Sequence, residues 1–128
     1  MAVTAAVVHR DDVEPRRAER GHIHPAHEEL FVVLEGDGSL ELTPSPHARG
    51  DDVIDESHAV RAGSVVSRAA GTRVAHPFPA SDRGLTLLAY GTREPNDIAY
   101  YPRSNKVFLR RAGVIGRLEH VSYWDGEH

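Results

Sequence analysis

The sequence predicts a single all-β domain, and three observations support this fold class. Short segments rich in valine and leucine recur along the chain, each bounded by glycine, proline, aspartate or serine. No window repeats apolar residues at the spacing of about 3.6 that marks an amphipathic helix. The length of 128 residues is close to the commonest domain size. We therefore expect one hydrophobic core inside a sandwich or barrel of short strands.

The first half of the chain begins with the segment MAVTAAVV, which is mildly apolar and lacks a basic lead-in. We interpret it as the first strand and not as a signal peptide. The run LFVVLEG is followed by Gly-Asp-Gly and the alternating segment SLEL, which predicts a hairpin with a tight turn over residues 30–43. Residues 43–60 are more polar, and we expect a surface loop there, with a short edge strand near Val53 and Ile54.

The second half of the chain contains four further segments that predict strands: GSVVSRAAG, LTLLAYG, KVFLRRAG and VIGRLEHV. Residues 91–106 hold two prolines and a pair of tyrosines, and we expect this segment to be irregular. We interpret Tyr123 and Trp124, near the C-terminal end, as anchors in the core or in an interface, because such rings contribute a large apolar area.

The composition excludes several classes of function. Apolar residues make up 40% and charged residues 27% of the chain, which is usual for a globular protein. The formal net charge of −4 argues against a nucleic-acid partner, since phosphate binding needs a concentrated basic surface. No apolar run approaches a membrane span, so we expect a cytoplasmic protein without a membrane partner. Because cysteine is absent, thiolate metal sites, disulfides and a cysteine nucleophile are excluded.

Histidines and glutamates are concentrated just before the LFVVLEG run. His22 and His24 are two residues apart, so an extended backbone places both imidazoles on one face, about 7 Å apart along the chain. Glu29 begins the next strand and shares a face there with Phe31 and Val33. The three side chains are therefore candidate ligands of one metal ion, and the alternative is a polar turn with locally hydrogen-bonded imidazoles. Nitrogen and oxygen ligands suit several transition metals equally.

The segment GHIHPAHEELFVVLEG resembles the first motif of the cupin superfamily, which reads His-x-His, three or four residues, Glu, six residues, Gly. His22, His24, Glu29 and Gly36 match these positions, and the count to Gly36 selects Glu29 over Glu28. The resemblance implies a double-stranded β-helix, or jelly-roll barrel, with a metal in its mouth. It also implies that His22, His24 and Glu29 are metal ligands.

The second cupin motif is matched only in part, by GSVVSRAAGTRVAHPFPA. Gly63 and Gly71 fit, but Ala69 stands where proline is usual and Ala80 replaces the asparagine. Four residues, where the motif has two, separate Gly71 from His76. A longer loop can still deliver an imidazole to the same point, so the resemblance makes His76 the candidate for the fourth metal ligand.

The resemblance covers about residues 18–90, which places the barrel core there and a C-terminal extension at residues 91–128 of a single domain, 1–128. The segment LAYGTREPNDIAYYPRSNKV is similar to the tails of a group of small bacterial cupins, some of which have been labelled sugar-phosphate isomerases. The resemblance to small cupins also implies a homodimer.

Three residues are candidate substrate contacts. Tyr90 and Arg93 belong to a polar and aromatic group that could form a wall gripping an anionic substrate. The alternative, which we favour for this group, is that the segment packs across the barrel exterior or at a subunit contact. Arg73 lies between Gly71 and His76 and could meet a substrate carboxylate.

The remaining histidines are weaker candidates. We expect His27 to face solvent in its turn, with contact to the metal as the alternative, and Glu28 to be a solvated charge or to contact a metal ligand. His47 and His58 lie in the polar loop, and we expect them on the surface. Three histidines have no partner at the spacing of metal ligands, and we treat them as incidental: His9, His120 and His128.

The sequence holds no G-x-S-x-G segment, phosphate-binding loop or nucleotide glycine fingerprint, so a metal would carry any chemistry. We expect a divalent transition metal (iron, manganese, nickel or zinc) in an enzyme that acts on a small oxygenated organic molecule, by dioxygenase or isomerase and lyase chemistry. No catalytic residue beyond the metal ligands can be identified. The alternatives are a non-catalytic module that binds a sugar or organic acid, and a protein similar to sugar-phosphate isomerases.

Overall fold

The computed structural model describes residues 6–15, 21–45 and 55–127. Its larger sheet has six antiparallel strands: β1 (Ala6–Val13), β2 (Glu29–Pro44), β3 (Glu56–Arg61), β4 (Val65–Arg68), β5 (Val74–Ala75) and β6 (Ala80–Thr92). The smaller sheet has three: β7 (Ile98–Tyr101), β8 (Lys106–Leu109) and β9 (Val114–Arg117). Within the described ranges, the one helical element is the 3-10 turn η1 (Arg110–Ala112), and no helix there is long and apolar enough to span a membrane.

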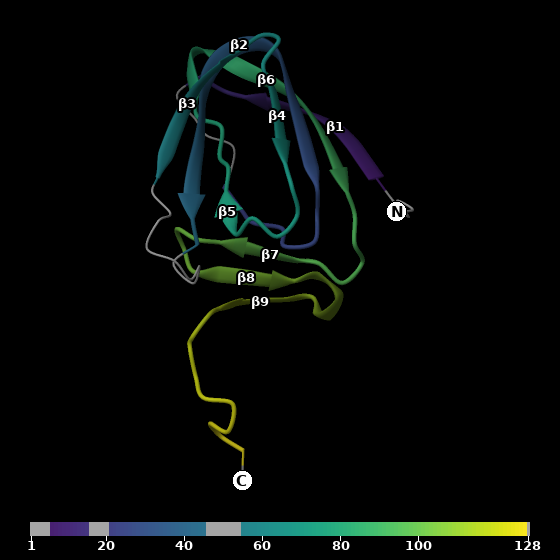
Figure 1. The fold of residues 1–128 in the computed structure, drawn as a ribbon, viewed down its shortest axis with the longest axis vertical. Coiled ribbons are helices and arrows are strands. Elements are labelled where there is room, and N and C mark those ends of the chain that lie inside the picture. The colour runs from purple at the N-terminus through teal and green to yellow at the C-terminus, as the bar shows by residue number, and fades with distance from the viewer. Residues whose placement is uncertain (1–5, 16–20, 46–54, 128) are drawn as a thin grey trace.

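Strand β2 organises the larger sheet. Its first half pairs with β6 and β4, while its second half pairs with β3 and β5, and β1 extends the sheet beyond β6. Figure 1 shows this sheet curling over at the top of the view, with β7, β8 and β9 lying across its lower end. The architecture confirms the predicted all-β jelly-roll barrel.

The predicted hairpin over residues 30–43 is wrong, because β2 runs through this region as one bent strand. The pairing of β2 with β6 shifts register twice, between Val33 and Glu35 and between Gly36 and Gly38. Gly36 has a φ of 80°, and a Cβ there would collide with the Gly84 carbonyl. Bulges bend a strand without reversing it, so the Gly-Asp-Gly step serves close approach and curvature where a tight turn was expected.

Two other expectations need correction. The surface loop predicted at residues 43–60 ends in strand β3, which pairs with β2 from Asp37 to Leu42, while Val53 and Ile54 lie outside the described residues. The irregular segment at residues 91–106 contains β7, which pairs with β8. The four strands predicted in the second half are confirmed as β4, β6, β8 and β9. The first strand, predicted at residues 1–8, overlaps β1 only at residues 6–8, because β1 continues to Val13 and residues 1–5 lie outside the described residues.

The core lies between the curved walls of the larger sheet. Val33, Phe78 and Leu87 are its largest fully buried side chains. Each such side chain contributes about 1.5–3 kcal/mol through burial of apolar area. Phe31, which is also buried in this cluster, lies on β2 two residues after Glu29. The core therefore fixes β2 at the position from which Glu29 projects.

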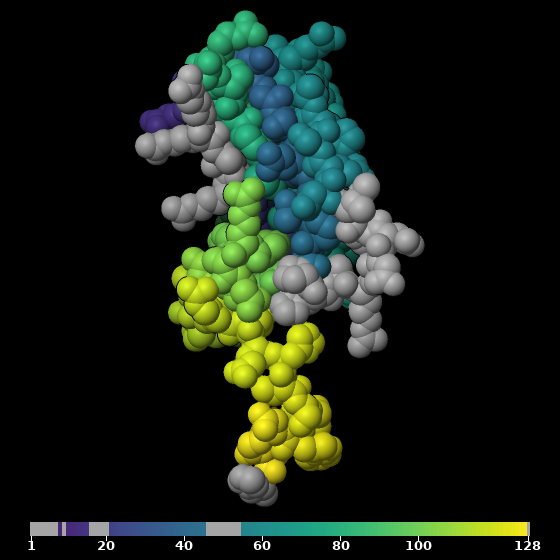
Figure 2. All heavy atoms as spheres, turned by 90° about the vertical axis from the view of Figure 1, so that its left-hand side faces the viewer, coloured from purple at the N-terminus to yellow at the C-terminus, as the bar shows by residue number. Residues whose placement is uncertain are grey.

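The residues after β9 leave the body of the protein as an extended tail (Figures 1 and 2). Tyr123 and Trp124 are 84% and 74% exposed, so their interpretation as core anchors is wrong. Their role as interface anchors stays a prediction.

Candidate metal centre

A cavity of about 220 Å³ opens beside the start of β2. The residues that line it come from segments far apart in the sequence: β1, the stretch before β2, β2 itself, the residue after β5, the end of β6 with the residue that follows it, and η1. The four predicted metal ligands are among its lining residues: His22, His24, Glu29 and His76.

The backbone of residues 21–24 is held extended by a bridge to β7. The Ile23 amide donates to the Tyr100 carbonyl at 2.8 Å, and the Tyr100 amide donates back at 3.0 Å. The Ile23 side chain is buried against Ala75 and Tyr100. Since alternate side chains of an extended segment point to opposite sides, His22 and His24 face the cavity. Their ring centroids are 4.5 Å apart.

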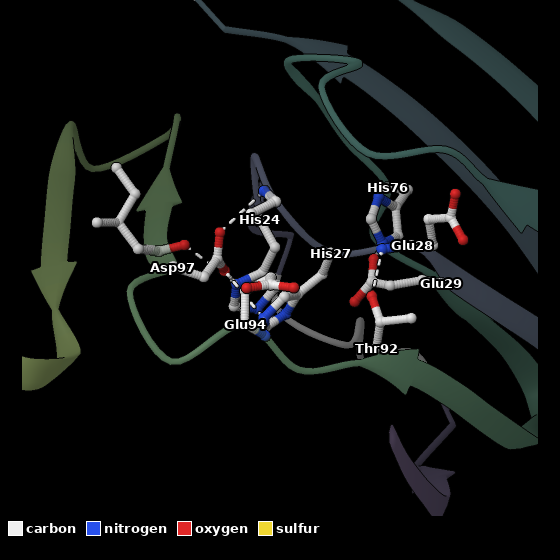
Figure 3. Close-up of polar contacts among 10 residues, drawn as sticks. His24, His27, Glu28, Glu29, His76, Thr92, Glu94 and Asp97 are labelled. Atoms are coloured by element: carbon white, nitrogen blue, oxygen red, sulfur yellow. Dashed lines mark hydrogen bonds and ion pairs between the residues drawn. The ribbon is translucent and has the colours of Figure 1, made fainter. Parts of the chain in front are cut away.

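Glu29 and His76 meet across the cavity from β2 and from the segment after β5. Glu29 Oε2 lies 2.6 Å from His76 Nε2, as Figure 3 shows. The candidate ligand atoms of His22, His24 and Glu29 all lie within 4.8 Å of one another. The His22 and His76 ring centroids are 6.3 Å apart. Three imidazoles and one carboxylate therefore border one small space.

The surroundings of Glu29 favour its ionised form. Burial raises the pKa of the carboxyl group, but the hydrogen bond from His76 and the electrostatic interactions with His76, His22 and His24 together outweigh burial. The pKa of Glu29 is therefore lowered below its ordinary value. The carboxylate is anionic at neutral pH, which is the form that binds a metal.

These donors fit a divalent transition metal. Imidazole nitrogen and carboxylate oxygen are ligands of iron, manganese, nickel and zinc alike. His76 Nε2 and Glu29 Oε2 share a proton in their contact. A cation that bound these two residues would displace that proton.

The sequence predicts that His27 faces solvent, but its side chain is buried, with 8% exposed. Its Nε2 atom accepts a hydrogen bond from the Glu94 amide at 2.9 Å, and its ring stacks on that of His24 at 4.7 Å between centroids. Burial lowers the pKa of His27 and outweighs the opposing charge of Asp97, which favours the neutral ring. The prediction is wrong because the turn at residues 24–28 folds against residues 94–97.

Asp97 is a buried polar residue beside this site that the sequence does not identify as a candidate. Its side chain is 1% exposed. One carboxylate oxygen lies 2.7 Å from His24 Nδ1, and the other accepts a hydrogen bond from the Ala26 amide at 2.9 Å (Figure 3). Asp97 follows His24 by 73 residues. No local spacing rule reveals such a contact, although Asp97 lies in the tail segment that carried the family resemblance.

The candidate substrate contacts divide between two places. Tyr90 and Arg93 line the cavity, together with Arg110 of η1, which the sequence analysis did not select. Arg73 lines a separate pocket of about 320 Å³, beside Ile23. Arg73 has a φ of 54° and is exposed, because the loop before β5 turns outward there. We therefore leave Arg73 out of the proposed site.

Neighbouring polar residues brace the start of β2 or lie away from the cavity. Glu28 is exposed, and its amide donates to the Thr92 hydroxyl at 2.9 Å while the Thr92 amide donates to the Glu28 carbonyl. His58 is exposed and contacts Glu56, as expected of a surface residue. His120 lines the pocket that contains Arg73. His47, His128 and the side chain of His9 lie outside the described residues.

Comparison with known proteins identifies the architecture. No protein-family model and no curated protein sequence matches the chain significantly. Among solved structures, one described as a candidate sugar phosphate isomerase from Acidithiobacillus ferrooxidans matches 91% of this chain and 72% of its own, with 22% identity and a TM-score of 0.70. A cupin-superfamily sugar phosphate isomerase from Silicibacter pomeroyi matches 92% and 72%, with 24% identity and a TM-score of 0.68.

A third similar structure is a recombinant oxalate oxidase in complex with glycolate. It matches 72% of this chain and 44% of its own, with 20% identity and a TM-score of 0.57. At these identities the similarities establish the fold. The chain therefore has the double-stranded β-helix fold of the cupin superfamily.

Proposed function

We propose that the protein is a metal-dependent enzyme that acts on a small oxygenated organic molecule carrying an anionic group. The observation that carries this proposal is the meeting of His22, His24, Glu29 and His76 around one cavity. Three buried or half-buried imidazoles beside an ionised carboxylate form a costly arrangement for a merely structural purpose, because polar groups lose hydration on burial. A divalent cation bound by all four offsets that cost.

The cavity supports a small substrate. Its volume of about 220 Å³ lies below the roughly 300–1,000 Å³ of pockets that take drug-sized ligands. Arg93 and Arg110 line it from the residues after β6 and from η1, and Tyr90 adds a phenol. A guanidinium binds a carboxylate or phosphate with two parallel hydrogen bonds, so these residues are suited to hold and orient an anionic group.

When bound, the metal supplies Lewis-acid polarisation of a substrate oxygen or redox chemistry. The likeness to two structures described as sugar phosphate isomerases supports the first, and the likeness to oxalate oxidase supports the second. The chain's own residues bind the anionic group, orient the substrate and place the apolar ring of Phe31 against the site, which limits entry of water.

The test is metal analysis followed by an activity screen. We expect the purified chain to bind one equivalent of transition metal, and His24→Ala and Glu29→Ala to lose it. His58→Ala is the matched control, since His58 is exposed and away from the cavity. The metal-loaded protein should then convert members of a panel of keto acids, hydroxy acids and sugar phosphates, assayed with and without oxygen. A metal-free wild-type chain, or metal retained in both variants, would contradict the proposal, while tight ligand binding without turnover would favour the binding module.

We also propose that the chain forms a homodimer through its C-terminal region. Exposed apolar residues gather on β9 and the tail: Val114, Ile115, Leu118, Val121, Tyr123 and Trp124. Acidic residues, Glu119, Asp125 and Glu127, lie among them, while Arg103 on the body of the protein is 80% exposed. Apolar anchors flanked by acidic groups suit a second copy that presents exposed arginines.

Sedimentation velocity tests this arrangement. The wild-type chain should sediment as a dimer and the double variant Tyr123→Ala, Trp124→Ala as a monomer. Val65→Ala, which truncates an exposed apolar residue on β4, should leave the dimer intact. A monomeric wild type or a dimeric double variant would overturn the proposal.

A further inference from the structure

We infer that Asp97 is a positioning residue of the proposed metal centre: it orients the His24 imidazole and holds the ring proton on Nδ1, which leaves the Nε2 lone pair for the metal. This inference rests on the proposed function, because it assigns a role to Asp97 through a candidate ligand. Asp97 is not among the residues that line the cavity, whereas His24 is, so Asp97 acts through His24.

The position of the His24 proton follows from the partners of Nδ1. This nitrogen lies 2.7 Å from a carboxylate oxygen of Asp97 and 3.1 Å from the Ile98 carbonyl oxygen. Both partners are acceptors, so Nδ1 must be the donor. A neutral imidazole carries one ring proton, and Nε2 therefore has a free lone pair. Imidazoles that ligate metals generally donate their other ring proton to a carboxylate or a carbonyl in this way.

The carboxylate of Asp97 is itself fixed and directed at His24. One oxygen accepts from the Ala26 amide at 2.9 Å, within the turn that carries the histidines. His27 Nε2 lies 3.5 Å from Asp97, but it already accepts a hydrogen bond from the Glu94 amide and has no proton there to donate. Of the two neighbouring imidazoles, only that of His24 therefore donates to Asp97. With a side chain only 1% exposed, Asp97 also resists competition from water.

Asp97 also connects the histidine turn to the strand that supports it. It immediately precedes β7, whose residue Tyr100 bridges Ile23. The backbone bridge holds the segment, and the contact with Asp97, which Figure 3 shows, holds the His24 ring. Fixing a ligand before the metal arrives lowers the ordering cost of binding.

The alternative is that His24, His27 and Asp97 form a second metal site, since their ligand atoms also lie within 4.8 Å of one another. The hydrogen bonds argue against it. His24 Nδ1 holds its proton between two acceptors, and the His27 Nε2 lone pair is used by the Glu94 amide. A cation there would displace both interactions, so we expect one metal per chain.

The decisive variant is Asp97→Asn, which keeps the shape of the side chain. Its oxygen can still accept from the Ala26 amide, and its amide group then points at His24 as a donor. A donor there opposes a proton on Nδ1, although the Ile98 carbonyl still accepts one, and so shifts the His24 proton toward Nε2, the atom needed by the metal. We expect Zn²⁺ affinity, measured by competition with a chromophoric chelator, to fall by about 10- to 100-fold. Asp125→Asn is the matched control, because it makes the same change on the exposed tail.

A second measurement needs neither a variant nor a metal. The ¹⁵N chemical shifts of the metal-free wild-type protein report which ring nitrogen of His24 carries the proton. Protonation at Nδ1 supports the inference, and protonation at Nε2 overturns it. Unchanged Zn²⁺ affinity in Asp97→Asn, or two Zn²⁺ ions per wild-type chain, would also overturn it. A wild-type chain that binds no Zn²⁺ would contradict the proposed function, while the ¹⁵N result would still decide the role of Asp97.

Discussion

The two segments that deliver imidazoles to the cavity are built differently. His24 is held at Nδ1 by Asp97 and the Ile98 carbonyl, within a turn tied to β7. His76 is buried, yet among the described residues its Nδ1 atom has no hydrogen-bond partner. Packing against Phe31, at 5.3 Å between ring centroids, and the contact with Glu29 hold the His76 ring. His24 is therefore positioned by hydrogen bonds at Nδ1, and His76 by packing and by its contact with Glu29 at Nε2.

The glycines of the two motif segments, Gly36 and Gly71, differ in how closely the surrounding chain approaches them. Gly36 and Gly71 both have a φ of 80°. A Cβ at Gly36 would collide with the Gly84 carbonyl, while a Cβ at Gly71 would meet nothing within 4 Å. The first segment is built into the barrel wall, and the loop that holds Gly71 is exposed. This difference explains why the spacing of the first motif is kept while the second accommodates two extra residues.

The largest effect should separate these two glycines. Gly36→Ala combines backbone strain of about 1–2 kcal/mol with a steric clash of about 1–3 kcal/mol. We expect it to lower the free energy of unfolding by about 3 kcal/mol, measured by urea denaturation. Gly71→Ala should cost only the backbone term, about 1 kcal/mol. Equal losses in the two variants would show that the barrel wall and the loop are equally constrained.

The next effect concerns the ionised ligand of the first segment. Glu29→Gln keeps the size of the side chain and removes its charge, so Zn²⁺ affinity should fall by about 100-fold, or roughly 2.7 kcal/mol. Glu28→Gln is the control, since the neighbouring side chain is exposed and is not among those lining the cavity. Chelator competition measures both. Equal affinities for the two variants would remove Glu29 from the centre.

The smallest effect concerns anion binding, and it compares Arg93, which lines the cavity, with Arg73, which lies in the segment that holds His76. Arg93 follows β6 and lines the cavity, whereas Arg73 precedes His76 and lines another pocket. Losing one charge-assisted hydrogen bond costs about 1.5 kcal/mol, or roughly tenfold in affinity. Arg93→Ala should therefore weaken glycolate binding to the Zn²⁺-loaded protein about tenfold by calorimetry, and Arg73→Ala should leave it unchanged. A loss of glycolate binding in Arg73→Ala but not in Arg93→Ala would place the anion beside Arg73.

Local patterns in the sequence account for most of the fold. Short runs of valine and leucine that end at glycine predicted β4, β6 and β8, because a strand's burial is reflected in residues close together in the chain. The Gly-Asp-Gly step misled, because the same residues that make a tight turn also permit a bulge. What decides between them is the partner strand: Gly36 faces Gly84 of β6, 48 residues later in the numbering.

The residues of the candidate site also divide into those that local spacing predicts and those that only long-range contacts bring to the site. His22, His24 and Glu29 could be selected because their spacing is short and regular, and the structure brings them together. Asp97 and Arg110 could not, since both reach the site through β7 and η1 from far along the sequence. A carboxylate that orients a metal ligand follows no periodic pattern in the sequence, and long-range contacts such as the pairing of Ile23 with Tyr100 bring it to His24.

The most direct test is anomalous X-ray diffraction from crystals of the wild-type protein grown with Zn²⁺. At the zinc absorption edge we expect one strong peak in the cavity, within bonding distance of His22, His24, Glu29 and His76. An empty cavity, or a peak seated between His27 and Asp97, would contradict the account.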